Sequence, residues 1–123
     1  MTKELMESEI KNKSLQIVDV RNKGEFDGTF RRATKSGHIS GATNQEWKKA
    51  LRRDGTFKDA SMLNKLYSNL EKDRETAIYC QSGYRAAHSW LVLRLLGFRS
   101  VRNYLGSWYE WGNDSETPVT LKN

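Results

Sequence analysis

Apolar positions recur along the chain at two spacings, one typical of helices and one typical of short strands. The clearest helical period repeats apolar residues at i, i+3, i+4 and i+7, and Asp59 or Ser61 is the expected N-cap of that helix. The residues of this core-facing stripe are Leu63, Leu66, Tyr67 and Leu70. Two further helices are predicted over residues 2–11 and 85–96, and Gly97 in the C′ position ends the second.

Short runs rich in β-branched and aromatic residues predict strands between these helices. The runs cover residues 15–20, 42–44, 76–79 and 98–105. A helix is expected to begin near Gln45, after the second of them. Strands that alternate with helices imply parallel pairing, with helices on both faces of the sheet. Because no repeat, low-complexity segment or linker divides the chain, we expect one domain over residues 1–123, a three-layer α/β/α sandwich around a mostly parallel sheet of about five short strands.

Composition and charge narrow the classes of function. The 123 residues include 21 Lys and Arg against 15 Asp and Glu, but the basic residues are spread through the chain, so we expect no nucleic-acid partner. The longest apolar run, from Trp90 to Leu96, is interrupted by Arg94 and is far shorter than the roughly 20 residues of a membrane-spanning helix. The first residues carry no apolar signal stretch. We therefore expect no membrane partner and a cytoplasmic location.

Cys80 is the single cysteine of the chain, so it forms no internal disulfide. It follows the predicted strand 76–79 and begins a short loop that runs directly into a helix. Backbone N–H groups at such a helix N-terminus form an anion-binding nest, in which a thiol ionises more readily and becomes nucleophilic. Gly83 permits the tight curl, and Arg85 is expected to bond loop carbonyls or to face the anion. A structural cysteine that closes a core strand is the alternative.

The carboxyl ends of parallel strands meet at one edge of a sheet, where α/β proteins bind their ligands. Arg21, Cys80 and the glycine turn after Leu105 each follow a predicted strand. The topology therefore predicts that these three features share one site.

Five segments of the chain, taken in order, carry a resemblance to a known family of domains. They are Ile17 to Arg21 with Glu25 to Gly28, then Gly37 to Ala42, Asp54 to Phe57, the Cys80 loop, and Asn103 to Asn113. In this order, and over nearly the whole chain, they resemble the rhodanese domain, most closely the C-terminal catalytic half of tandem-domain thiosulfate and mercaptopyruvate sulfurtransferases.

The resemblance implies sulfane-sulfur transfer by an enzyme of the thiosulfate sulfurtransferase type. Catalytic Cys80 attacks the outer sulfur of a small anionic donor such as thiosulfate and carries it as a persulfide to an acceptor, which is a thiol, a cyanide-like nucleophile or a protein. Two-step covalent catalysis predicts ping-pong kinetics. The chemistry implies neither a metal nor an organic cofactor. The residues implied to bind substrate are Gln81, Ser82, Gly83, Tyr84, Arg85 and Arg21.

Three side chains near this edge have competing roles. Arg21 lies beside the active loop, as the resemblance implies, or it braces Asp19 or a loop carbonyl through a salt bridge or hydrogen bond. His38 lies within a recurring turn of the family, and its expected role is structural rather than that of a general base. Trp108 is expected to contribute both to the rim of the pocket and to packing.

The loop also departs from the thiosulfate-preferring enzymes that it resembles. Gln81 and Ser82 are neutral where those enzymes often carry basic residues, and Glu25 stands where they use a further arginine. The mercaptopyruvate-type enzymes also use that arginine, so neither preference transfers, and thiosulfate is kept as the default donor. One alternative is a sulfur-relay or binding module that receives persulfide from a protein partner. Another is a cysteine phosphatase of the same fold, but phosphatase loops are longer by one residue, and the spacing from Cys80 to Arg85 suits a single sulfur atom better than a tetrahedral oxyanion.

Overall fold

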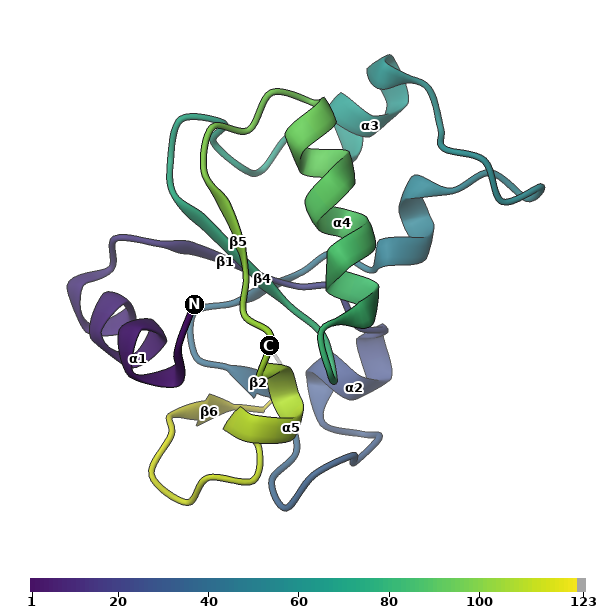
Figure 1. The fold of residues 1–123 in the computed structure, drawn as a ribbon. Coiled ribbons are helices and arrows are strands. Elements are labelled where there is room, and N and C mark those ends of the chain that lie inside the picture. The colour runs from purple at the N-terminus through teal and green to yellow at the C-terminus, as the bar shows by residue number, and fades with distance from the viewer. Residues whose placement is uncertain (122–123) are drawn as a thin grey trace.

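The computed structural model describes residues 1–121, and a parallel sheet lies at its centre (Figure 1). The strands are β1 (Gln16–Asp19), β3 (Thr43–Asn44), β4 (Thr76–Tyr79) and β5 (Val101–Asn103), in the spatial order β3, β1, β4, β5. Every neighbouring pair in this sheet is parallel. The α/β prediction is confirmed. Within residues 1–121 this sheet has four strands, where about five were expected.

Successive residues of the two central strands point to opposite faces of the sheet, as the β pleat requires. Ile17 and Ala77 pack in one core cluster, whereas Val18 and Ile78 pack in the other. All four side chains are buried, so both faces of the sheet are covered. Full burial on both faces explains why these strands read as continuous apolar runs in the sequence.

Two helices from the inner part of the chain cover one face of the sheet, and two helices from nearer its ends cover the other. On the face with Val18, α3 (Ala60–Leu66) and α4 (Tyr84–Leu95) contribute Leu63, Ala86, Val92 and Leu93. On the other face, α1 (Lys3–Asn12) and α5 (Ser107–Trp111) contribute Met6, Trp108 and Trp111. The predicted three-layer arrangement is thus the observed one.

The helices with strong local signals form close to their predicted positions. Asp59 is the N-cap of α3, and its carboxylate accepts the backbone N–H of Met62 at 2.9 Å. This helix ends at Leu66, earlier than the apolar period suggests, and the side chain of Gln45 donates to the Leu66 carbonyl at that end. The helix expected from Gln45 is a single 3₁₀ turn, η1 (Trp47–Ala50).

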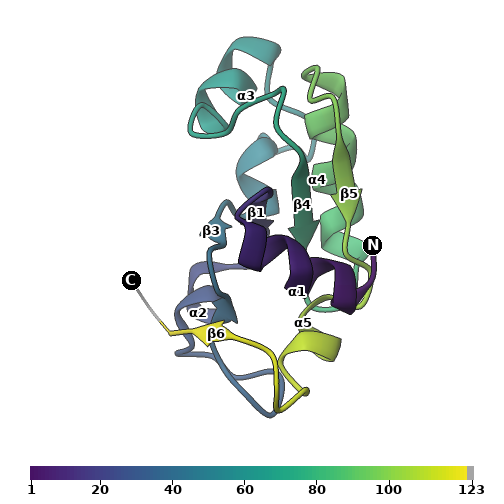
Figure 2. The ribbon, with the colours of Figure 1, turned by 90° about the vertical axis from the view of Figure 1, so that its left-hand side faces the viewer.

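Four short elements lack any signal in the apolar pattern. They are α2 (Lys23–Asp27), α5, and the strands β2 (His38–Ile39) and β6 (Val119–Thr120), which pair antiparallel with each other. In two views at right angles, α2, α5 and β6 lie at one end of the molecule and α3 lies at the opposite end (Figures 1 and 2). The strands β1 and β4 run toward the end that carries α2 and α5, so their carboxyl ends open there.

The membrane expectation rests on helix length and apolarity. None of the helices in residues 1–121 combines the length and the apolar character that crossing a bilayer requires.

Candidate active site

The loop after β4 wraps its own backbone around the thiol of Cys80. The Cys80 Sγ accepts the backbone N–H of Gly83 at 3.0 Å and that of Ala86 at 3.4 Å. Gly83 adopts φ 96° as the N-cap of α4, and a Cβ at this position would lie 3.3 Å from the side chain of Leu105. Two inward N–H donors and the start of a twelve-residue helix surround the sulfur, an arrangement that stabilises negative charge there.

The end of β5 and the segment that follows it contact this loop from outside. The Ser107 hydroxyl accepts the backbone N–H of Cys80 at 3.2 Å and donates to the Tyr104 carbonyl at 2.8 Å. The N–H of Trp108 donates to the Cys80 carbonyl at 2.9 Å, and the side chain of Asn103 donates to the Gly83 carbonyl at 3.1 Å. Ser107 has φ 53°, a strained value for a residue with a side chain. The sequence reasoning did not single out Asn103 or Ser107 for this role, although both lie where a predicted strand runs out into a glycine turn.

Arg85 is fastened to a carboxylate from another part of the chain. Its Nη1 and Nη2 lie 2.8 Å and 3.0 Å from the two oxygens of Glu25, a bidentate pair. The Glu25 side chain is fully buried, whereas the Arg85 side chain is 25% exposed. Burial by itself raises the pKa of Glu25, but the hydrogen bonds and charge of Arg85 outweigh it and hold this pKa below its ordinary value. The expected bonds from Arg85 to loop carbonyls are replaced by this pair.

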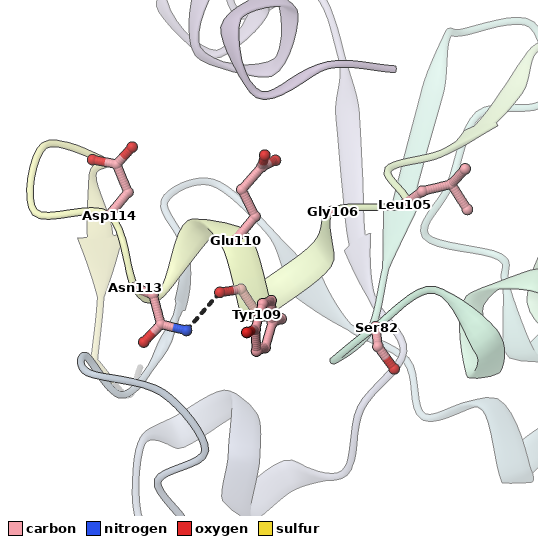
Figure 3. Close-up of a pocket in the computed structure, with 7 residues that line it drawn as sticks. All are labelled: Ser82, Leu105, Gly106, Tyr109, Glu110, Asn113 and Asp114. Atoms are coloured by element: carbon pink, nitrogen blue, oxygen red, sulfur yellow. Dashed lines mark hydrogen bonds between the residues drawn. The ribbon is translucent and has the colours of Figure 1, made fainter.

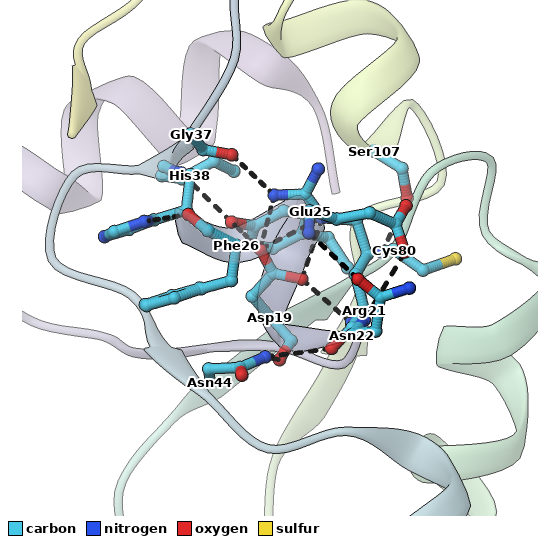
Figure 4. A network of polar contacts seen from close by, with 12 residues as sticks. Asp19, Arg21, Asn22, Glu25, Phe26, Gly37, His38, Asn44, Cys80 and Ser107 are labelled. Atoms are coloured by element: carbon cyan, nitrogen blue, oxygen red, sulfur yellow. Dashed lines mark hydrogen bonds and ion pairs between the residues drawn. The ribbon is translucent and has the colours of Figure 1, made fainter. Parts of the chain in front are cut away.

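Arg21 occupies a sealed polar cluster next to the Cys80 loop (Figure 4). Its Nη2 lies 2.6 Å from Asp19 and 2.7 Å from the Gly37 carbonyl, and its guanidinium carbon lies 4.7 Å from the ring centroid of Trp108. The Tyr79 hydroxyl donates to Asp19 at 2.8 Å. Arg21 is only 1% exposed. It contacts both Asp19 and a loop carbonyl, the two alternatives that the sequence left open. A donor would contact this guanidinium only after displacing these partners.

The two histidines of the chain, His38 and His88, make packing and hydrogen-bond contacts away from Cys80. The Nδ1 of His38 donates to the Phe26 carbonyl at 2.8 Å, and the ring stacks on that of Phe26 with centroids 3.6 Å apart. His88, on α4, packs edge-on against Trp47 and Phe57, and burial lowers its pKa. Among the hydrogen bonds of residues 1–121, none joins either imidazole to Cys80.

Two hollows flank the Cys80 loop and share Ser82. One is drawn in Figure 3 and is lined by Ser82, Leu105, Gly106, Tyr109, Glu110, Asn113 and Asp114. The other is more basic and is lined by Asn22, Arg32, Glu46, Trp47, Lys48, Gln81, Ser82 and Arg85. Of the loop residues predicted to bind substrate, the structure thus places three beside the second hollow. Tyr84 is 85% exposed, and its side chain lines neither hollow.

The aromatic residues after β5 divide between core and surface. Trp108 and Trp111 are fully buried, whereas Tyr109 is exposed on the wall of the first hollow. The expectation that Trp108 forms part of the rim is therefore wrong, because its ring packs beneath the loop against Arg21. The described part of the chain contains no cluster of His, Cys, Asp or Glu side chains arranged to hold a metal ion. What the site offers chemically is one thiol sulfur with backbone donors around it.

Comparison with known proteins relates the chain to one family. The family model described as a Rhodanese-like domain matches residues 2–114. A thiosulfate sulfurtransferase of Corynebacterium glutamicum is 42% identical over 125 residues, which cover 94% of this chain and 42% of that protein. The sulfur carrier protein TtuD of Thermus thermophilus is 44% identical over 84% of this chain and 40% of its own length. The chain thus spans about two fifths of these curated relatives.

Solved structures agree on the fold. The complex of EanB Y353A with ergothioneine superposes with a TM-score of 0.90 at 23% identity, covering 100% of this chain and 32% of that one. The crystal structure of YnjE gives a TM-score of 0.89 at 24% identity, with the same coverage. At these identities the likeness concerns the fold alone.

Proposed function

Because the chain belongs to the rhodanese-like domain family, we propose that it is a sulfurtransferase that moves a sulfane sulfur from thiosulfate or a similar donor to a thiophilic acceptor. The carrier is a persulfide on Cys80. The observation that carries this proposal is the cradle of the Cys80 Sγ, which accepts two backbone N–H groups at the start of α4. Relatives named thiosulfate sulfurtransferase at about 42% identity support the donor class.

The first half-reaction needs only the thiolate and the donor. The Cys80 thiolate attacks the outer sulfur of thiosulfate, the S–S bond of the donor breaks, and sulfite leaves with the electron pair. The product is a Cys80 persulfide anion. In the second half-reaction an acceptor thiolate attacks the terminal sulfur, and the Cys80 thiolate is released with the electron pair of the broken bond. No oxidant or reductant is consumed, which fits a site made of a thiol and fixed donors.

The loop residues take complementary parts in this proposal. The backbone of Gln81 to Arg85 supplies partial positive charge around the persulfide, and the side chains of Gln81, Ser82 and Arg85 border the hollow through which the donor approaches. Arg21 supports the loop from its buried cluster rather than by direct contact with the donor. These roles require neither a metal nor an organic cofactor.

A protein-delivered persulfide is the second candidate for the donor. The relative named sulfur carrier protein TtuD supports it.

We also propose that the chain is a single domain over residues 1–123 that corresponds to the C-terminal catalytic domain of tandem sulfurtransferases, since it carries the loop cysteine. A cytoplasmic location, where the thiol stays reduced, completes the proposal. A phosphatase reaction is disfavoured because Arg85 is already paired with Glu25.

Intact-mass measurement after incubation with thiosulfate, without reductant, tests the proposal. We expect the wild-type protein to gain the mass of one sulfur atom, and dithiothreitol to remove it. The Cys80→Ser variant should keep the fold and gain nothing, because a hydroxyl stays protonated and holds no persulfide. Sulfur transfer that survives in Cys80→Ser would remove Cys80 from the mechanism. If thiosulfate leaves the wild type unchanged while an organic persulfide loads it, the donor class is the persulfide.

A further inference from the structure

The basic hollow beside the Cys80 loop contains less free positive charge than its lining suggests. Its cationic side chains are Arg32, Lys48 and Arg85. Glu25 lies underneath with its carboxylate fully buried, 2.8 Å from Arg85 and 3.9 Å from Arg32. Two of the three cations therefore share one buried carboxylate. Glu46 also lines the hollow and lowers its positive potential further.

Geometry holds Glu25 in this place independently of any donor. Its backbone N–H donates to the Asn22 side chain at 2.9 Å and its own carboxylate accepts the Asn22 N–H at 3.4 Å, so it closes the capping box of α2. The same carboxylate accepts both prongs of the Arg85 guanidinium. An ion pair at this distance acts on a more distant anion as a dipole, whose field is much weaker than that of a free cation.

We infer that Glu25 is a positioning residue that sets donor selectivity. It fixes Arg85 beside the loop and cancels most of the positive charge of that arginine. The site therefore favours sulfur donors with at most one negative charge, of the organic persulfide class, over the dianion thiosulfate. This inference rests on the proposed function. Glu25 acts through Arg85 and does not reach the reacting atoms. With a persulfide donor R–S–S–H, the Cys80 thiolate attacks the outer sulfur and the S–S bond of the donor breaks. R–S⁻ leaves with the electron pair of that bond, and the proton stays on the new persulfide.

The ratio of kcat/KM for thiosulfate to kcat/KM for 2-hydroxyethyl persulfide tests this inference. In Glu25→Gln the amide keeps the shape of the side chain and removes its charge, so the ratio should rise about tenfold, as expected for one unit charge near a bound dianion at an intermediate dielectric. Added potassium chloride should reduce the gain, because salt screens a charge effect in a hollow open to water.

Asp27→Asn is the matched control. Asp27 lies two residues further along α2, on a different side of the helix, and pairs with the exposed Lys23. Asp27→Asn changes the net charge by the same amount as Glu25→Gln, and its selectivity ratio should equal that of the wild type. An equal loss toward both donors in Glu25→Gln, with no change in the ratio, would reduce Glu25 to a structural residue and overturn the inference.

A second variant keeps the test decisive if Glu25→Gln does not fold. Arg32 is 46% exposed, so Arg32→Gln should fold and should lower the selectivity ratio about threefold by removing a cation from the same hollow. An unchanged ratio there overturns the inference. Failure of the proposed function looks different: neither donor would then add sulfur to Cys80 of the wild type by intact mass. Loading by both donors with a ratio that ignores Glu25 and Arg32 overturns the inference alone.

Discussion

Two carboxylate–arginine pairs lie at the same end of the sheet, yet their surroundings are opposite. The pair of Asp19 and Arg21 is buried, with side-chain exposures of 0% and 1%. The Tyr79 hydroxyl donates to Asp19, and Arg21 donates to the Gly37 carbonyl and packs against the ring of Trp108. The pair of Glu25 and Arg85 is open on one side, where the arginine meets the basic hollow. The difference in burial means that the first pair stabilises the fold, whereas the charge of the second pair can influence what binds in the hollow.

Asp19→Asn is expected to have the largest effect on stability. The amide leaves the Arg21 guanidinium buried without the carboxylate that it contacts, and breaking a buried pair from one side costs about 3 to 5 kcal/mol of the free energy of unfolding. Urea denaturation at neutral pH measures this. Glu25→Gln is the chemically matched control, since it makes the corresponding change in the open pair. A cost below that of the control would show that the sealed cluster is not what braces this end of the sheet.

Tyr79→Phe probes the same sealed cluster through one hydroxyl. The change leaves the backbone N–H of Ile39, 3.0 Å from that hydroxyl, and one oxygen of Asp19 without this partner. We expect a loss of about 1 to 3 kcal/mol, measured by the same denaturation. Tyr67→Phe is the control: its buried hydroxyl makes no hydrogen bond of normal geometry among residues 1–121, so the loss there should be close to zero. Equal losses in the two variants would contradict the assignment.

Glu25→Gln is expected to change stability less than Asp19→Asn or Tyr79→Phe. Arg85 stays partly exposed to water, and the amide oxygen still accepts one of its N–H groups, so the cost should be at most about 1 kcal/mol. Selectivity between donors should nevertheless change strongly, as set out above. A loss as large as that of Asp19→Asn would mean that the open pair is as structural as the sealed one.

Acidification gives the smallest and most specific difference. The folded pKa of Glu25 lies below its unfolded value, so its ionised form stabilises the folded state above about pH 4.3, the ordinary value for glutamate, and this contribution is lost as the pH falls through the folded pKa. The stability gap between wild type and Glu25→Gln should therefore stay constant down to about pH 5 and shrink below it. Urea denaturation at several pH values measures it, and a gap that stays constant would show that Arg85 does not depress this pKa.

The parts of the fold that the sequence predicts well are those with a local signal. The strand at 76–79 forms with the predicted bounds, Asp59 caps its helix, and Cys80 follows a buried strand into the start of α4. In each case the signal is a run or period of apolar residues, or a capping residue a few positions away. The helix α5 has no such signal, because it has five residues and no side-chain cap. The helix α2 is as short and has no apolar period, and its only local signal is the capping box of Asn22 and Glu25.

The candidate site divides in the same way. The position of Cys80 and its tight loop follow from a strand, a glycine and a helix start that are adjacent in the chain, and Asp19 lies two residues from Arg21. The partner of Arg85 is 60 residues away, and Ser107 is 27 residues from Cys80. The sequence alone therefore determined the layers and the sheet edge at which Cys80 lies, since apolar periodicity reports which residues leave water. Only the tertiary structure decided how charges pair around that thiol, because an ion pair depends on which side chains the fold brings within about 4 Å.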